Sequence, residues 1–164
     1  MSKEIDIEYY HQLALQKQKE HRKVLANLKK KPPKNLDKIA QQIHQEVFAE
    51  IDCTVCANCC KTLGPDFKEA DITRIAKYFK MKLPAFEAEF LQVDEDEDKV
   101  FKSMPCPFLG GDNLCSIYDV RPKACREFPH TDRKKIYQIN HLTIKNTLTC
   151  PAAYLFVEKL KDKL

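Results

Sequence analysis

Apolar residues recur every three or four positions along several stretches of the chain, which is the spacing of one buried helix face. The first such stretch, residues 1–31, contains no Gly or Pro and ends directly before Pro32. Because proline cannot continue a helix, the pattern predicts a helix over 1–31, with a polar stretch interrupting its apolar face. Its apolar positions are Ile5, Tyr9, Leu13, Leu25 and Leu28.

A second helix is predicted after Asn35, a residue type that can cap a helix N-terminus. Its apolar positions are Leu36, Ile39, Ile43, Val47 and Ile51. We expect this face to pack on the rest of the protein. The two helices form a predicted N-terminal helical extension over residues 1–50, and an unknown protein partner of these helices is one role left open.

The chain changes character after residue 51, because all eight cysteines and seven of the nine prolines follow it. Asp66 and Glu69 have the spacing of a capping box and precede apolar residues at helical intervals, which predicts a helix over about 67–80. Pro84 predicts the start of another short helix.

The acidic run 94–98 is interpreted as a solvated loop, since it lacks the Gly and the closing glutamate of an EF-hand. The pattern over 136–144 does not decide between strand and helix. A final helix is predicted from Pro151.

Charge and hydropathy exclude several classes of function. The 28 basic and 24 acidic side chains nearly cancel, leaving a net charge of +4, which is too small to indicate nucleic-acid binding. The first residues lack the apolar segment of a secretory signal, and no apolar run is long enough for a bilayer. The expected location is therefore cytoplasmic, with no membrane partner. In that reducing compartment, clustered cysteines favour metal or redox chemistry over disulfides.

Four of the cysteines fall within eight residues, and the other four are widely spaced. They are Cys53, Cys56, Cys59 and Cys60, then Cys106, Cys115, Cys125 and Cys150. Two-residue gaps let successive sulfurs turn towards one centre, as in zinc knuckles and ferredoxins. Adjacent side chains point apart, so Cys59 and Cys60 are expected to serve different centres. We predict that all eight are metal ligands, in two sets of four or one bridged pair.

The identity of the metal stays open between zinc and an iron-sulfur cluster. A remote Cys150 followed by Pro151 is similar to the bacterial ferredoxin run, which favours iron-sulfur. Zinc is the metal more commonly bound by cysteine sets in which some pairs are close in sequence and others are distant. A thiol enzyme is a disfavoured alternative, because His130 is the one histidine near a cysteine in sequence and no catalytic constellation is evident.

The segment 115–129 offers cations beside the predicted ligands. Four thiolates around a divalent ion carry a net charge of about −2, which arginines nearby would stabilise. Arg121 and Arg126 are the candidates, and surface ion pairs with Asp119 or Glu127 are the alternative.

These motifs resemble the YkgJ-like cysteine-cluster proteins, the CxxCxxCC family of zinc- or iron-chelating domains. The resemblance rests on the run from Cys53 to Cys60 and on the segments 105–109, 115–118 and 121–129, with a closing Cys150. It covers roughly residues 51–155.

The resemblance implies metal chelation in a small intracellular protein, without a settled reaction. A similar cysteine-rich region occurs in flagellin lysine methylases, but this chain shows no Gly-rich loop for a methyl donor. One departure is Ala57-Asn58, where relatives often have Gly before the third cysteine.

Composition completes the prediction of fold. About a third of the residues are charged, with only three Gly and no Trp, which favours helix. The expected fold class is mostly α: a small metal-stabilised cysteine-rich domain with irregular loops over 51–164, preceded by N-terminal helices. The expected function is metal binding, with an iron-sulfur redox or enzyme-accessory protein as the alternative.

Overall fold

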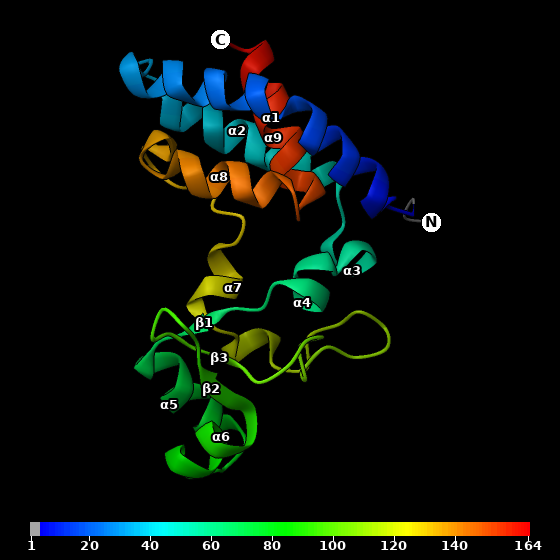
Figure 1. Cartoon of the computed structure of the whole chain (residues 1–164), viewed down its shortest axis with the longest axis vertical. Coiled ribbons are helices and arrows are strands. Elements are labelled where there is room, and N and C mark those ends of the chain that lie inside the picture. Colours follow the sequence, from blue (N-terminus) through cyan, green and yellow to red (C-terminus); the bar gives the residue numbers. More distant parts are fainter. Residues whose placement is uncertain (1–3) are drawn as a thin grey trace. The chain divides into compact units, whose positions relative to one another are not determined.

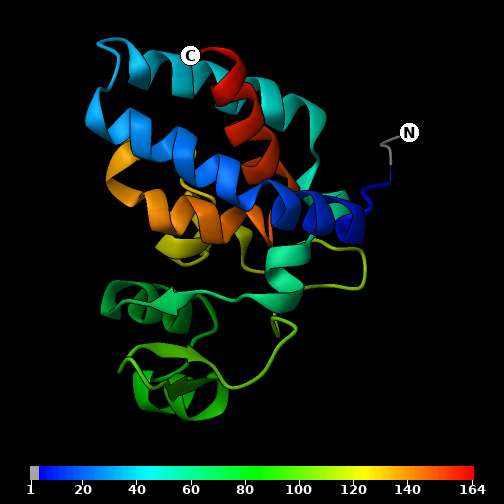
Figure 2. The same ribbon diagram turned by 45° about the horizontal axis from the view of Figure 1, so that its top comes forward.

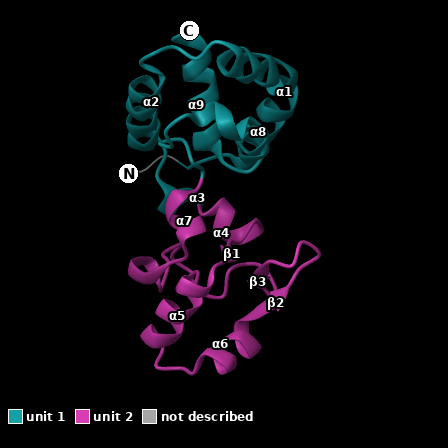
Figure 3. Ribbon diagram, turned by 90° about the vertical axis from the view of Figure 1, so that its left-hand side faces the viewer, with its two compact units in different colours: residues 1–56, 129–164 teal, residues 57–128 magenta. Residues whose placement is uncertain are grey.

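The computed structural model describes residues 4–164, and helix predominates in it (Figure 1), which confirms the predicted mostly α class. The chain forms two compact units (Figure 3). Unit 1 contains the described residues up to 56 together with residues 129–164, and unit 2 contains residues 57–128. The division into an extension over 1–50 and a domain over 51–164 stays a prediction. None of the helices in residues 4–164 combines the length and apolarity needed to cross a bilayer.

Unit 1 is a group of helices taken from both ends of the chain (Figure 2). Its elements are α1 (Ile7–Lys30), α2 (Leu36–Glu50), α3 (Cys53–Cys56), the 3-10 helix η2 (Ile136–Ile139), α8 (Asn140–Thr147) and α9 (Pro151–Asp162). Helix α9 packs against α1, α2 and α8. The apolar core includes Leu25, Ile43, Val47, Phe156 and Leu160. Residues 136–144, which the sequence left undecided, are helical.

The two predicted N-terminal helices are α1 and α2, with small differences at their starts. Helix α1 begins at Ile7 because the Asp6 carboxylate accepts a hydrogen bond from the Tyr9 N–H at 2.9 Å. Residues 1–3 of the predicted helix lie outside the described residues. Asn35 precedes α2 as predicted, but its side chain makes no capping hydrogen bond.

Unit 2 combines short helices with a small antiparallel sheet. Its elements are α4 (Asn58–Thr62), β1 (Asp66–Phe67), α5 (Glu69–Tyr78), α6 (Leu83–Phe90), β2 (Leu91–Val93), β3 (Lys99–Phe101), the 3-10 helix η1 (Tyr118–Val120) and α7 (Lys123–Glu127). The strand order is β1-β3-β2, and Val100 lies opposite both Asp66 and Gln92. The acidic run forms the exposed turn between β2 and β3, as predicted.

Phenylalanine rings fill the core of unit 2. Phe108 lies at its centre, with ring centroids 5.0 Å from Phe90, 5.3 Å from Phe79 and 5.7 Å from Phe101. Such pairs add packing energy beyond the apolar area that they bury. Because Phe108 follows Cys106 by two residues, this core also anchors a cysteine-bearing loop.

The predicted capping box at the start of α5 is wrong. Asp66 is held in β1 by its pairing with Val100, so it cannot cap a helix. The N-cap is Lys68, whose backbone N–H donates to Asp71 Oδ2 at 3.0 Å, while Glu69 instead pairs with Lys99 Nζ at 2.7 Å.

Ala57 connects α3 and α4 in a left-handed conformation, with φ 46° and ψ 16°. This conformation costs a residue with a Cβ about 1–2 kcal/mol. Replacing Ala57 with glycine removes that strain but also loses a buried methyl worth about 0.8 kcal/mol and adds chain entropy.

We therefore expect Ala57→Gly to change the free energy of unfolding by less than about 0.5 kcal/mol. The control Ala76→Gly, at a buried position within α5, should cost about 1.5–2 kcal/mol because no strain is relieved there. Denaturant titration of both variants measures the difference. Equal losses would show that residue 57 is not in the left-handed region.

Candidate metal centre

Four cysteines of unit 2 lie close enough for the charge of one thiolate to shift the pKa of another. They are Cys60 in α4, Cys106 after β3, Cys115 before η1, and Cys125 in α7. The ionised Cys60 acts on each of the other three. We call these four residues the first cysteine group.

Backbone hydrogen bonds hold three members of the first cysteine group in place. The Cys106 N–H donates to the carbonyl oxygen of Cys60 at 2.8 Å, which joins two segments far apart in sequence. Cys115 forms an antiparallel bridge with Leu109, and the neighbouring Ser116 N–H donates to the Phe108 carbonyl at 2.9 Å. The loop between Cys106 and Cys115 therefore folds back on itself and returns the second cysteine towards the first.

The thiols of the first cysteine group differ in acidity. A hydrogen bond from Cys59 lowers the pKa of Cys60 to about 7. Burial, followed by the charges of Cys60 and Cys115, raises the pKa of Cys106 to about 11. Desolvation and the charge of Cys60 also raise the pKa of Cys115. The same two effects raise the pKa of Cys125, although this residue is largely exposed.

Arg121 supplies positive charge beside this group. Its guanidinium carbon lies 3.9 Å from the centre of the Tyr118 ring, and its Nη1 donates to the Tyr118 carbonyl at 2.7 Å. The arginine charge acts to lower the pKa of Cys115 and Cys125, against the larger effect of desolvation. Glu127, one alternative partner considered for the arginines, pairs with Lys123 at 3.6 Å.

Three further cysteines, Cys53, Cys56 and Cys150, come together in unit 1 and form the second cysteine group. Cys53 and Cys56 are the first and last residues of the single-turn α3. That turn starts at Asp52, whose Oδ1 accepts from the Thr54 N–H at 2.9 Å and from its hydroxyl at 2.6 Å.

Cys150 is the N-cap residue of α9. Burial raises its pKa to about 12, although hydrogen bonds from the N–H groups of Ala153 and Ala152 lower it. The charges of Cys53 and Cys56 raise it further, which indicates that the three thiols are neighbours. His130 also belongs to unit 1, where it adopts a left-handed conformation with φ 65°.

The cysteines are neighbours, but they are not arranged as ligands. Within residues 4–164, no group of three or more His, Cys, Asp or Glu side chains could hold a metal ion as it stands. That all eight cysteines are ligands stays a prediction.

Two residues of α5 that the sequence analysis left out contact the segment that carries Cys125. Asp71 accepts a hydrogen bond from the Lys123 N–H at 3.1 Å, and Arg74 donates to the Arg121 carbonyl at 2.8 Å. In the sequence, an Asp followed by an Arg three positions later indicates only an ordinary ion pair on a helix surface.

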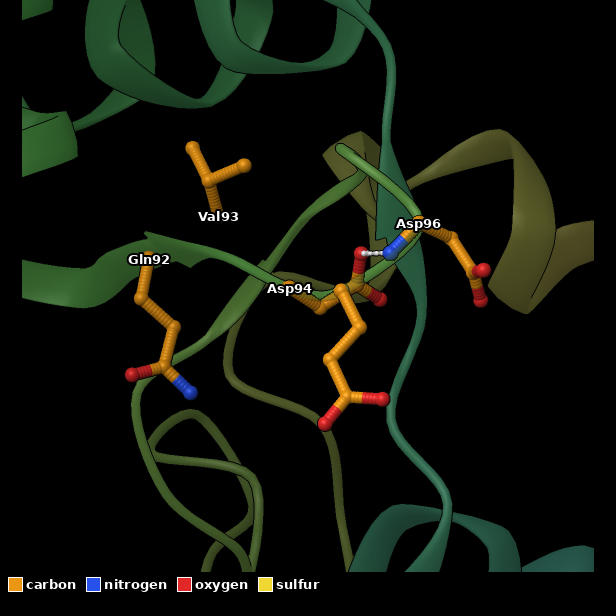
Figure 4. Close-up of a pocket in the computed structure, with 5 residues that line it drawn as sticks. Gln92, Val93, Asp94 and Asp96 are labelled. Atoms are coloured by element: carbon orange, nitrogen blue, oxygen red, sulfur yellow. Dashed lines mark hydrogen bonds between the residues drawn. The ribbon is translucent and has the colours of Figure 1, made fainter.

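A pocket without a cysteine in its lining lies at the tip of the β2–β3 hairpin (Figure 4). It is lined by Gln92, Val93, Asp94, Glu95 and Asp96. Asp94 Oδ1 accepts hydrogen bonds from the N–H groups of Asp96 and Asp98, both at 2.9 Å. This carboxylate therefore stabilises the turn. None of the cysteines predicted as metal ligands lines the pocket.

Comparison with known proteins points to the cysteine-bearing region. The family model CxxCxxCC, described as "Putative zinc- or iron-chelating domain", matches residues 52–151. Neither the curated proteins nor the solved structures give a match.

The pKa differences predict which thiol reacts first in metal-free protein. The thiolate is the nucleophile, so at pH 7 iodoacetamide should alkylate Cys60 at least about tenfold faster than Cys106 or Cys150. Peptide mass spectrometry over a time course measures the three rates.

The Cys59→Ala variant removes the hydrogen bond that lowers the pKa of Cys60. The pH at which Cys60 alkylation is half-maximal should then move up from about 7. An unchanged pH profile in this variant would contradict the assigned cause.

Proposed function

Because the chain belongs to the CxxCxxCC family of zinc- or iron-chelating domains, we propose that its first cysteine group holds one metal centre through four thiolates. The observation that carries this proposal is the proximity of Cys60, Cys106, Cys115 and Cys125, which alter one another's acidity. Four sulfur ligands in tetrahedral arrangement suit zinc and also suit iron-sulfur centres.

The donor set fits such a metal chemically. Soft thiolates select zinc and iron-sulfur clusters over hard cations such as magnesium or calcium. A bound metal would supply positive charge to thiolates that otherwise repel one another, and Arg121 would offset part of the remaining negative charge. Binding would also fix the rotamers of the four side chains.

We propose a second centre at Cys53, Cys56 and Cys150. Three thiols leave one position of a tetrahedral centre for a further ligand. Cys59, which is hydrogen-bonded to Cys60, is the one cysteine that neither group includes. If Cys59 is a metal ligand, each of the two centres has four thiolates. If it is not, its role is to modulate Cys60.

Metal identity is tested on protein purified without oxygen. Elemental analysis and visible absorption distinguish the two metals, since thiolate-to-iron charge transfer colours the protein brown and zinc leaves it colourless. We expect one or two equivalents of zinc, or iron with acid-labile sulfide. Fresh, reduced protein with well under one equivalent of either metal would overturn the proposal.

The ligand assignment is tested with eight single Cys→Ser variants. Changing any member of the first cysteine group should remove about one metal centre per chain and lower the melting temperature, because a structural metal stabilises its fold strongly. Variants of the second cysteine group should lose the other centre and keep the first. Wild-type metal content in two or more variants of the first cysteine group would contradict the assignment.

The raised pKa values predict that metal binding releases protons. At pH 7 the thiols of Cys106, Cys115 and Cys125 are protonated and that of Cys60 is about half ionised, so a divalent ion should displace about 3.5 protons. Affinity should rise with pH, by three to four powers of ten per unit near pH 7.

Zinc titration of the metal-free protein in a pH-stat counts these protons. A Cys53→Ser, Cys150→Ser double variant confines the count to the first cysteine group. Release of fewer than about two protons per ion would show that the group does not bind as four thiolates.

A further inference from the structure

The carboxylate of Asp71 in α5 is buried, with the residue 2% exposed, and it accepts hydrogen bonds from three residues. Its Oδ2 accepts from the Lys68 N–H at 3.0 Å. Its Oδ1 accepts from Arg74 Nη2 at 2.8 Å and from the Lys123 N–H at 3.1 Å. Lys123 is the first residue of α7, so Asp71 binds the helix that carries Cys125.

Arg74 extends the same contact one turn further along α5. Its Nε donates to the Val120 carbonyl at 3.1 Å, and its Nη2 donates to the Arg121 carbonyl at 2.8 Å. Val120 is the last residue of η1, so the guanidinium group bridges the end of η1 and the approach to α7. Together, Asp71 and Arg74 form hydrogen bonds with the backbone of three of the four residues of the segment 120–123, namely 120, 121 and 123.

Cys125 depends on this contact more than the other three cysteines of its group. Cys60 and Cys106 are joined to each other through their backbones, and Cys115 is held by its bridge with Leu109. Cys125 lies on α7, a helix of five residues that needs support from other segments and also packs against β1. The segment that leads into α7 is fixed to α5 by the Asp71–Arg74 pair.

We propose that the Asp71–Arg74 pair positions Cys125 for metal coordination by fixing the segment 120–123 against α5. This inference rests on the proposed metal centre of the first cysteine group. The pair touches no ligand atom, and it acts through the backbone that leads to Cys125.

Arg74→Lys is the most discriminating variant. Lysine keeps the positive charge beside Asp71, but it lacks the planar fork that donates to two carbonyl groups at once. The control Lys99→Gln removes a different ion-pair cluster of unit 2, with Glu69 and Glu87. It measures the effect of losing surface ion pairs in the same unit.

The experiment measures the alkylation rate of each cysteine in metal-loaded protein by peptide mass spectrometry. In the wild type, all four cysteines of the first group should be protected relative to metal-free protein. In Arg74→Lys, Cys125 should lose protection by about tenfold or more, while Cys60, Cys106 and Cys115 change by less than about twofold. Lys99→Gln should leave all four protected.

Asp71→Asn is the second variant and covers the case in which Arg74→Lys fails to fold. The amide oxygen can still accept from the Lys123 N–H, but it pairs less strongly with Arg74, and the amide NH2 group cannot accept from the Lys68 N–H as Oδ2 does. Asp71→Asn should give the same selective loss of protection from alkylation at Cys125, with a smaller change in rate. A general loss of protection at all four cysteines, or none at Cys125, would overturn the positioning role.

The wild-type arm separates this inference from the function on which it rests. If metal protects none of the four cysteines in the wild type, the metal centre itself is refuted, and the inference falls with it. If the wild type is protected and the variants behave like Lys99→Gln, only the positioning role is refuted.

Discussion

A buried carboxylate has to find donors for its oxygens, and in unit 2 this requirement fixes the course of the chain around Asp71. Burial acts to raise the pKa of this carboxyl, but hydrogen bonds from Lys68, Arg74 and Lys123 hold the pKa below its ordinary value. A buried polar group left without its partner costs about 1–3 kcal/mol. Backbone N–H groups of Lys68 and Lys123 must therefore converge on α5, and this places the start of that helix and the start of α7 together.

The phenylalanine core supports the loop that carries Cys106 and Cys115. Phe108 packs among the rings of Phe79, Phe90 and Phe101, and it lies in the loop between Cys106 and Cys115. Apolar packing thus positions the turn, and backbone hydrogen bonds position the thiols on it.

Helices with a periodic apolar face were predictable from the sequence, because local spacing decides which face is buried. This holds for α1, α2 and α9. The short strands were not predicted, because two or three residues are too few to show an alternation of apolar and polar positions. The capping box failed at Asp66 because strand pairing with Val100 overrode a local preference.

The cysteines themselves were identifiable from their spacing, but their grouping was not. Sequence distance gives no reason why Cys150 should lie near Cys53 and Cys56, whereas Cys125 lies near Cys60. That separation follows from tertiary structure, in which α9 returns to α1 and α2. The contacts of Arg74 could not be predicted for the same reason, because two of its partners are main-chain carbonyls more than forty residues away in the sequence.

Unit 1 is built from two separated pieces of the chain, and this has a consequence for how the protein is made. Synthesis proceeds from the N-terminus, so α1 and α2 emerge from the ribosome long before α9, the helix against which both pack. Every residue of unit 2 is translated in the interval. The nascent chain therefore carries all eight of its thiols before α9 is complete and unit 1 can close, because Cys150 also precedes α9.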